Sequence, residues 1–165
     1  MIVPMPQSAS LPARAAAYVA AALALVYAMV RIYWALGGHA LLSTVGGSIA
    51  DLARRGGATA IALGVIVVLL KLAGALLALA LVFPASRPPC RVVFVLAGVG
   101  GVMLTLYGGV LVVAGALVLT DVIRPTGPVD RAALRWHVLL WDSWFLAWGI
   151  ALGLAAWLRR RDKPI

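Results

Sequence analysis

The chain has 165 residues, of which 64% are hydrophobic and only 12% are charged, well below the charged fraction of about 25% in ordinary soluble domains. Too few polar residues remain to cover the apolar surface of a water-soluble fold, which excludes soluble enzymes, disordered regions and disulfide-linked secreted domains. The formal net charge of +9 comes from short basic runs between long apolar segments. That spacing is typical of the flanks of membrane spans and not of a nucleic-acid-binding face.

Four apolar segments are long enough to cross a bilayer, which takes about 20 residues in a helix. They cover residues 15–37, 57–83, 92–120 and 136–158. Helices are expected because unpaired backbone groups are costly in lipid and the segments lack the alternation of barrel strands. The linkers are short. We therefore predict an all-α, integral membrane four-helix bundle that forms a single domain over residues 1–165.

The distribution of Lys and Arg predicts how this bundle is oriented. Seven basic residues fall on the side of both termini: Arg14, Arg87, Arg91, Arg159, Arg160, Arg161 and Lys163. Five fall on the opposite side: Arg54, Arg55, Arg124, Arg131 and Arg135. Because basic residues are enriched in cytoplasmic loops, both termini are predicted to be cytoplasmic.

Glycine recurs regularly in the third span. Gly101, Gly108 and Gly115 are each seven residues apart, so they lie along one helical face where another helix can approach closely. Helix packing is the expected role, and a groove for the alkyl chain of a ligand is the alternative.

Three ionisable side chains lie inside the spans, where each costs several kcal/mol unless it is paired or hydrated. Arg31 and Asp142 each lie about 9 Å below the extracytoplasmic ends of their spans, at about 1.5 Å per residue. Their equal depth predicts an ion pair. Lys71 is nearer the midplane, at the level of Tyr107, whose phenol is its expected partner. A purely structural contact that holds two helices together is the alternative role for each of these side chains.

Aromatic residues gather in the fourth span, which holds five of the six tryptophans. At about 100° per residue, one face of this helix carries a histidine and four aromatic rings, with Asp142 at its edge: His137, Trp141, Trp144, Phe145 and Trp148. Trp148 is about 18 Å from the start of the span, too deep for an interfacial aromatic belt alone. We predict a cavity open to the outer half of the bilayer, with a belt and aromatic packing as the alternative.

Span one adds Tyr27, Arg31 and Trp34 to this cavity on one face, with Tyr33 on an adjacent side. Aromatic walls attract positive charge. An acid at the mouth can protonate an alkene or epoxide, and the rings then stabilise the carbocation and exclude water. The sequence leaves open whether Asp142 is that acid or the structural partner of Arg31, with His137 and Asp121 as reserve donors.

Two histidines, His39 and His137, fall on the extracytoplasmic side. A bis-histidine haem on a four-helix bundle is therefore an alternative. His39, however, stands beside Gly37 and Gly38 in an expected loop, and the chain has one cysteine and no glutamate to complete another metal site. The sequence therefore predicts no metal and no cofactor.

Three motifs carry a resemblance to known proteins: Tyr33 to Gly38 (YWALGG), Tyr107 to Gly109 (YGG), and the more specific W-H-x-x-L-W-D-x-W-F string that begins at Trp136. From about Arg31 to Trp157 the chain resembles small four-span bacterial membrane proteins of a domain-of-unknown-function family. It is also similar to small membrane-bound terpene cyclases of bacterial indole-sesquiterpenoid pathways. The resemblance implies cyclisation of a prenylated or epoxidised isoprenoid, and a multi-pass protein of the bacterial cytoplasmic membrane.

We therefore expect a membrane-embedded biosynthetic cyclase or isomerase of isoprenoid-like substrates that uses acid-initiated carbocation chemistry. The predicted catalytic residues are Asp142, His137, Arg31 and Tyr33. The predicted substrate-binding residues are Trp34, Tyr27, Tyr107, Trp136, Trp141, Trp144, Phe145 and Trp148. The expected partners are the hydrophobic substrate and membrane lipids, without nucleic acid, and the oligomeric state stays open. A non-catalytic membrane subunit or lipid-binding protein is the main alternative, and a small transporter is the other.

Overall fold

The computed structural model of the chain describes residues 8–46, 57–83 and 90–162. Every regular element within these residues is helical. Four helical segments are long and apolar enough to cross a membrane: Leu11–Ala35, Ile61–Ala80, Arg91–Leu119 and Arg131–Arg161. The prediction of an all-α bundle with four spans is therefore confirmed, and the observed helices begin and end close to the predicted boundaries.

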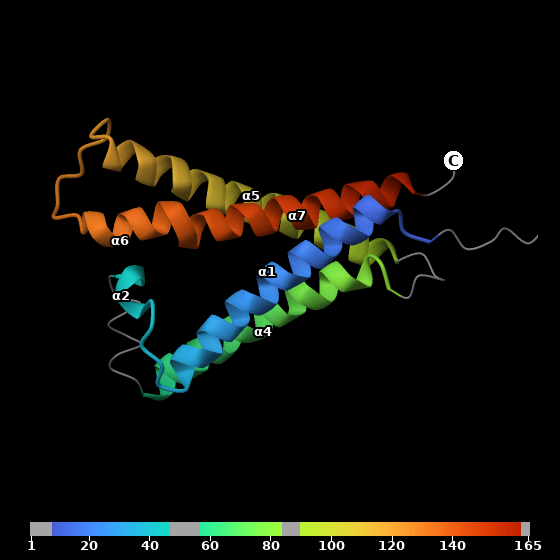
Figure 1. Cartoon of the computed structure of the whole chain (residues 1–165), viewed down its shortest axis with the longest axis horizontal. Helices are drawn as coiled ribbons and strands as arrows, with labels where there is room; N and C mark the ends of the chain where they lie inside the picture. The colour runs from blue at the N-terminus through green and yellow to red at the C-terminus, as the bar shows by residue number, and fades with distance from the viewer. Residues whose placement is uncertain (1–7, 47–56, 84–89, 163–165) are drawn as a thin grey trace, which may run out of the picture.

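The four long helices form two antiparallel pairs. Helix α1 (Leu11–Ala35) packs on α4 (Ala58–Ala80), and α5 (Arg91–Leu119) packs on α7 (Asp142–Arg161). The two pairs cross each other, close together at the end that holds the termini and apart at the other end (Figure 1). Helices α1 and α7 make the main contact between the pairs, whereas α4 and α5 barely touch.

Short helical elements occupy the wider end of the bundle (Figure 1). Helix α2 (Leu42–Val45) follows α1, and α6 (Arg131–Trp136) continues through a π-helical turn, η1 (His137–Trp141), directly into α7. Asp130 fixes the start of α6, because its carboxylate accepts hydrogen bonds from the backbone N–H groups of Ala132 and Ala133, both at 3.0 Å.

Alanine forms most of the core between α1 and its neighbours. Every buried residue of α1 except Tyr27 is an alanine, among them Ala13, Ala17, Ala20, Ala24 and Ala28. They meet further alanines of α4 and α7, among them Ala75, Ala78 and Ala155. In lipid, helices associate through close packing of small residues instead of through the hydrophobic effect. The large aliphatic side chains of α4 and α5 are accordingly free to face the bilayer.

The glycine stripe of α5 lies against α7, so the predicted close approach of a neighbouring helix is confirmed. A Cβ atom at Gly101 would lie 2.7 Å from the Cα of Gly153 and 3.1 Å from the carbonyl oxygen of Gly149. A Cβ atom at Gly115 would lie 2.5 Å from a methyl group of Val138. Gly101 therefore sets the distance between the backbones of α5 and α7, and Gly115 leaves room for the Val138 side chain of η1.

The beginning of α1 and the end of α7 are joined at the narrow end of the bundle. The backbone N–H of Ser10 donates a hydrogen bond to Asp162 Oδ2 at 2.9 Å. Nearby, Arg159 Nε donates to the carbonyl oxygen of Leu81 at 3.1 Å. The first and fourth spans consequently have these ends on the same side of the bundle.

Candidate functional site

A π-helical turn changes the register of the fourth span at its most polar point. In a regular α-helix, side chains five residues apart project about 140° from each other, so His137 and Asp142 would diverge. Within η1 the turn holds an extra residue, and His137 Nδ1 lies 3.3 Å from Asp142 Oδ1. Such π-bulges occur frequently at functional sites. We refer to these two side chains as the His137–Asp142 pair.

The hydrogen bonds of His137 define how many protons this pair holds. His137 Nε2 lies 2.9 Å from the carbonyl oxygen of Val45, and a carbonyl oxygen only accepts, so Nε2 carries a hydrogen. A neutral ring then presents a lone pair on Nδ1 toward Asp142. The contact requires one further proton, carried either by the carboxyl group or by Nδ1. Because Asp142 is only 7% exposed, this shared proton is shielded from bulk solvent.

Indole N–H groups connect α2 and the preceding turn to the helices. Trp141 Nε1 donates to Thr44 Oγ1 at 3.1 Å, and Trp34 Nε1 donates to the carbonyl oxygen of Ala40 at 2.8 Å. These bonds hold α2 against η1, where Val45 accepts from His137. Helix α2 therefore lies against the turn that carries His137.

The predicted ion pair between Arg31 and Asp142 is wrong. The carboxyl group faces His137 because the extra residue of η1 rotates Asp142 away from the direction that a regular helix would give it. The guanidinium carbon of Arg31 instead lies 5.3 Å from the centre of the Trp34 ring. Among the described residues, Arg31 has no acidic partner.

Tyr27 is the centre of an aromatic cluster between α1 and the fourth span. Its ring centre lies 5.7 Å from that of Trp141, 5.9 Å from that of Trp144 and 5.3 Å from that of Phe145. Trp34 extends the cluster, with its ring centre 5.5 Å from that of Trp141. Aromatic residues of the two spans therefore meet as predicted. The predicted hollow is found only in part, because Arg31 and the Trp148 indole line one cavity whereas Asp142 does not line it.

Trp144 ties this cluster to α1 by a hydrogen bond, its Nε1 donating to the carbonyl oxygen of Leu23 at 3.0 Å. Trp144→Phe keeps an aromatic ring but removes the donor, and we expect it to destabilise the fold by about 0.6–1.7 kcal/mol, the range for polar contacts between membrane helices. Thermal unfolding in detergent measures this. Trp136→Phe is the control, since Trp136 is 45% exposed. Equal unfolding temperatures for both variants would contradict the expectation.

A cavity of about 670 Å³ lies beside this cluster, between α4, α5 and α7. Its aromatic wall consists of Tyr107, Phe145 and Trp148, and its basic groups are Arg31 and Lys71. The Nζ atom of Lys71 lies 4.0 Å from the centre of the Tyr27 ring and 5.5 Å from that of Phe145. The expected contact between Lys71 and the phenol of Tyr107 is thus replaced by ring contacts, while Tyr107 packs edge-on against Phe145.

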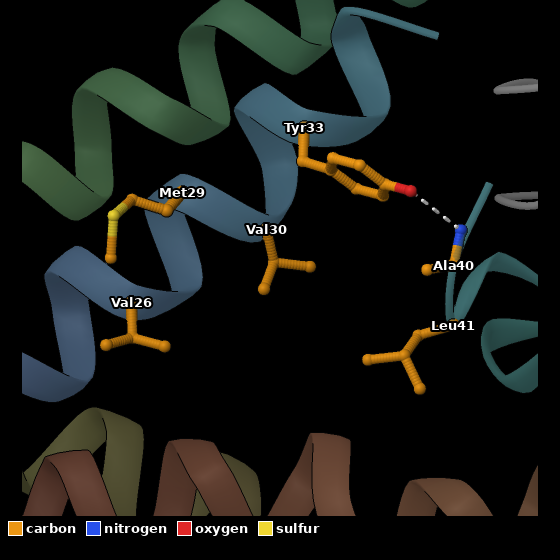
Figure 2. Close-up of a pocket in the computed structure, with 6 residues that line it drawn as sticks. All are labelled: Val26, Met29, Val30, Tyr33, Ala40 and Leu41. Atoms are coloured by element: carbon orange, nitrogen blue, oxygen red, sulfur yellow. Dashed lines mark hydrogen bonds between the residues drawn. The ribbon is translucent and has the colours of Figure 1, made fainter. Parts of the chain in front are cut away.

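Two predicted site residues lie apart from the rest. The Tyr33 hydroxyl accepts a hydrogen bond from the backbone N–H of Ala40 at 3.4 Å (Figure 2), and its ring lines a smaller cavity of about 270 Å³. Trp136 is largely exposed at the start of the fourth span. The reserve donor Asp121 is exposed and forms an ion pair with Arg131. Of the predicted proton donors, the structure brings only His137 and Asp142 together.

The structure gives no support to a haem site formed by the two histidines. His39 is exposed in the turn after α1, and both ring nitrogens of His137 already have protein partners. Within the described ranges, no group of three or more His, Cys, Asp or Glu side chains is arranged to hold a metal ion.

Sequence comparison relates the chain to one family of proteins. No curated protein and no solved structure matches the chain. One family model, described as "Protein of unknown function (DUF3995)", matches residues 24–152. The matched segment contains Tyr27, Lys71 and the His137–Asp142 pair, and it covers well over half of the chain. The chain therefore belongs to the DUF3995 family, as its motifs predicted.

Proposed function

We propose that this protein is a membrane-embedded enzyme that cyclises a hydrophobic, isoprenoid-like substrate by acid-initiated carbocation chemistry. The observation that carries the proposal is the His137–Asp142 pair, a buried carboxyl whose Oδ1 lies 3.3 Å from Nδ1 of the imidazole across a π-helical turn. Phe145, one helical turn further along, connects Tyr27 to the wall of the lipid-side cavity. A proton donor and an apolar binding space are therefore neighbours in the fold.

The reaction begins when the protonated carboxyl of Asp142 gives its proton to an alkene carbon or an epoxide oxygen. With an alkene, the π electrons form the new C–H bond and leave a carbocation on the adjacent carbon. With an epoxide, one C–O bond breaks, a hydroxyl forms and a carbocation remains. The π electrons of a second alkene then form a C–C bond, and loss of a proton to the carboxylate restores the pair. Substrate and product are isomers, so the reaction needs no oxidant or reductant.

Aromatic rings near the donor supply the stabilisation that such a cation needs. The ring faces of Tyr27, Phe145 and Trp148 attract positive charge, and this attraction is strongest where water is excluded. Asp142 itself does not line the cavity. Proton transfer consequently requires a side-chain movement at Phe145, which contacts both the Tyr27 cluster and the cavity.

A non-catalytic lipid-binding protein is the second candidate, and one observation favours it. The cavity is lined by two cations, Lys71 and Arg31, whereas the carboxyl of Asp142 lies outside its lining. In this case the His137–Asp142 pair is a latch within the fourth span, and a bound amphiphile leaves the protein chemically unchanged.

The location that we propose is the bacterial cytoplasmic membrane, with both termini in the cytoplasm. The hydrogen bond between Ser10 and Asp162 supports a common side for the two ends. Arg159, Arg160 and Arg161 lie in the last turn of α7 at that end, and basic clusters favour the cytoplasmic side. Membrane lipids and the hydrophobic substrate are the partners that we propose, without nucleic acid.

The test of the enzymatic proposal is a search for an isomeric product. Purified protein in liposomes is incubated in D₂O with acyclic prenyl-arene and epoxy-prenyl-arene substrates, and the products are analysed by mass spectrometry. We expect a cyclic isomer that is absent from protein-free liposomes, and incorporation of deuterium at carbon when an alkene is protonated. Recovery of every substrate unchanged, from protein that binds it, would instead support the lipid-binding candidate.

A further inference from the structure

Three residues that line the larger cavity carry polar donors that lack acceptors among the described residues. Arg31 Nε and Trp148 Nε1 are buried and have no hydrogen-bond partner. Lys71 Nζ has only the ring contacts with Tyr27 and Phe145. Lys71 and Trp148 are each 5% exposed. Buried donors without acceptors are rare in native proteins and costly, the more so when they are charged.

The charges on this wall have one sign. The described residues that line the cavity include two cations, Lys71 and Arg31, and no aspartate. The nearest buried carboxyl, that of Asp142, is occupied by His137. Ionisable groups inside a membrane are found paired or in cavities that serve a function. An anion is therefore the ligand that would satisfy the electrostatics of this wall.

The remaining wall is apolar and lies at the least closed seam of the bundle. Leucines of three helices form it: Leu70, Leu77, Leu96, Leu104 and Leu152. Because α4 and α5 barely touch, the cavity lies where a chain can enter sideways from the lipid. Its volume of about 670 Å³ is within the usual range of about 300–1,000 Å³ for ligand sites. These features fit a hydrocarbon chain, which a free inorganic anion lacks.

We propose that this cavity binds a single-chain amphiphile with an anionic head group, a carboxylate or a phosphate, held by Lys71 and Arg31. Its hydrocarbon chain lies along the leucines between α4 and α5. The binding step needs neither Asp142 nor any proton transfer, so it stands whether or not the protein is a cyclase.

Affinity for matched charged and uncharged chains tests the proposal. The protein is placed in phosphatidylcholine nanodiscs and titrated with farnesyl phosphate and oleate, with farnesol and oleyl alcohol as uncharged counterparts. Native mass spectrometry and tryptophan fluorescence report binding. We expect each anion to bind about tenfold or more tightly than its alcohol, and inorganic phosphate alone to show no binding. A stronger response to farnesyl phosphate identifies a phosphate head group, and a stronger response to oleate identifies a carboxylate.

Lys71→Met is the variant that tests the residue assignment. It replaces a buried charge by an apolar side chain of similar length, a change that buried sites often tolerate. We expect it to weaken the binding of both anions by about tenfold or more and to leave the affinity for the alcohols unchanged. Arg124→Gln is the matched control, because Arg124 is an exposed cation in the loop after α5, and it should bind as the wild type does.

Three results would overturn the proposal, and the first two need no variant. They are equal affinity of the wild type for anions and alcohols, binding of inorganic phosphate as tightly as of farnesyl phosphate, and an unchanged preference for anions in Lys71→Met. None of these measurements involves turnover. An absence of anion binding can therefore be distinguished from an absence of cyclase activity.

Discussion

Asp142→Asn should lower the rate of cyclic product formation by about 10²- to 10⁴-fold, the usual contribution of a positioned general acid. Asparagine has no transferable proton, yet its amide N–H can still donate to Nδ1 of His137, so the contact inside η1 survives. We therefore expect the loss to appear in kcat, with KM and the thermal unfolding temperature near wild-type values. Initial rates and unfolding curves on the same preparation measure both quantities.

Asp121→Asn is the matched control for that change. Asp121 is an acid of the same type, but it is exposed in the loop after α5 and pairs with Arg131. Its substitution should leave turnover unchanged. If Asp142→Asn instead retained full turnover and lost stability, the His137–Asp142 pair would be a latch between parts of the fourth span, and the lipid-binding candidate would be favoured.

The number of spans and the small-residue contacts followed from the sequence because they depend on helix geometry alone. Apolar length fixes the spans, and a seven-residue repeat such as Gly101, Gly108 and Gly115 places its members on one face. The π-helical turn breaks the assumption of about 100° per residue on which every helical projection rests. Because of this turn, the carboxyl of Asp142 contacts His137, a partner that a regular helix would not give it.

The position of the cavity was predicted only in part, for a different reason. Depth along a helix predicted that Arg31 and Asp142 meet, but depth does not say which side chain fills the space between them. Tyr27 fills it. The open space lies instead between α4 and α5. Small residues allow close packing of α1 on α4 and of α5 on α7, whereas α4 and α5 make few contacts with each other. Four predicted site residues do line this cavity, and Lys71, a charge near the middle of a span, was a further sequence signal for it: Arg31, Tyr107, Phe145 and Trp148.

The two proposals are linked by electrostatics. The Nζ atom of Lys71 lies 5.5 Å from the centre of the Phe145 ring, so a carbocation against that ring would be repelled by the ammonium group. At an effective dielectric constant of about 20, two unit charges about 5 Å apart interact by about 3 kcal/mol. An anionic head group bound at Lys71 and Arg31 would cancel this opposition. A substrate that carries its own anion would therefore meet both the binding and the chemical requirements of the cavity.

The second large effect that we expect is on assembly, from Gly108→Val. A Cβ atom at Gly108 would lie 2.7 Å from the carbonyl oxygen of Asp142 and against the backbone nitrogen of Leu146. Both are main-chain atoms of α7, so the clash is relieved only by moving that helix. Overpacking of this kind typically costs about 1–3 kcal/mol and occasionally more. Thermal unfolding and the yield of folded protein in detergent measure the loss.

Gly98→Val is the control that distinguishes the clash between α5 and α7 from the general effect of a valine in α5. Gly98 lies on the same helix, and a Cβ atom there meets nothing within 4 Å, while the change in helix propensity is the same at both positions. Gly98→Val should therefore unfold like the wild type. Because Gly108 lies against the backbone of Asp142, Gly108→Val should also displace the His137–Asp142 pair and reduce turnover in whatever folded protein remains. Equal unfolding temperatures for the two variants would show that α5 and α7 are not in backbone contact at this glycine.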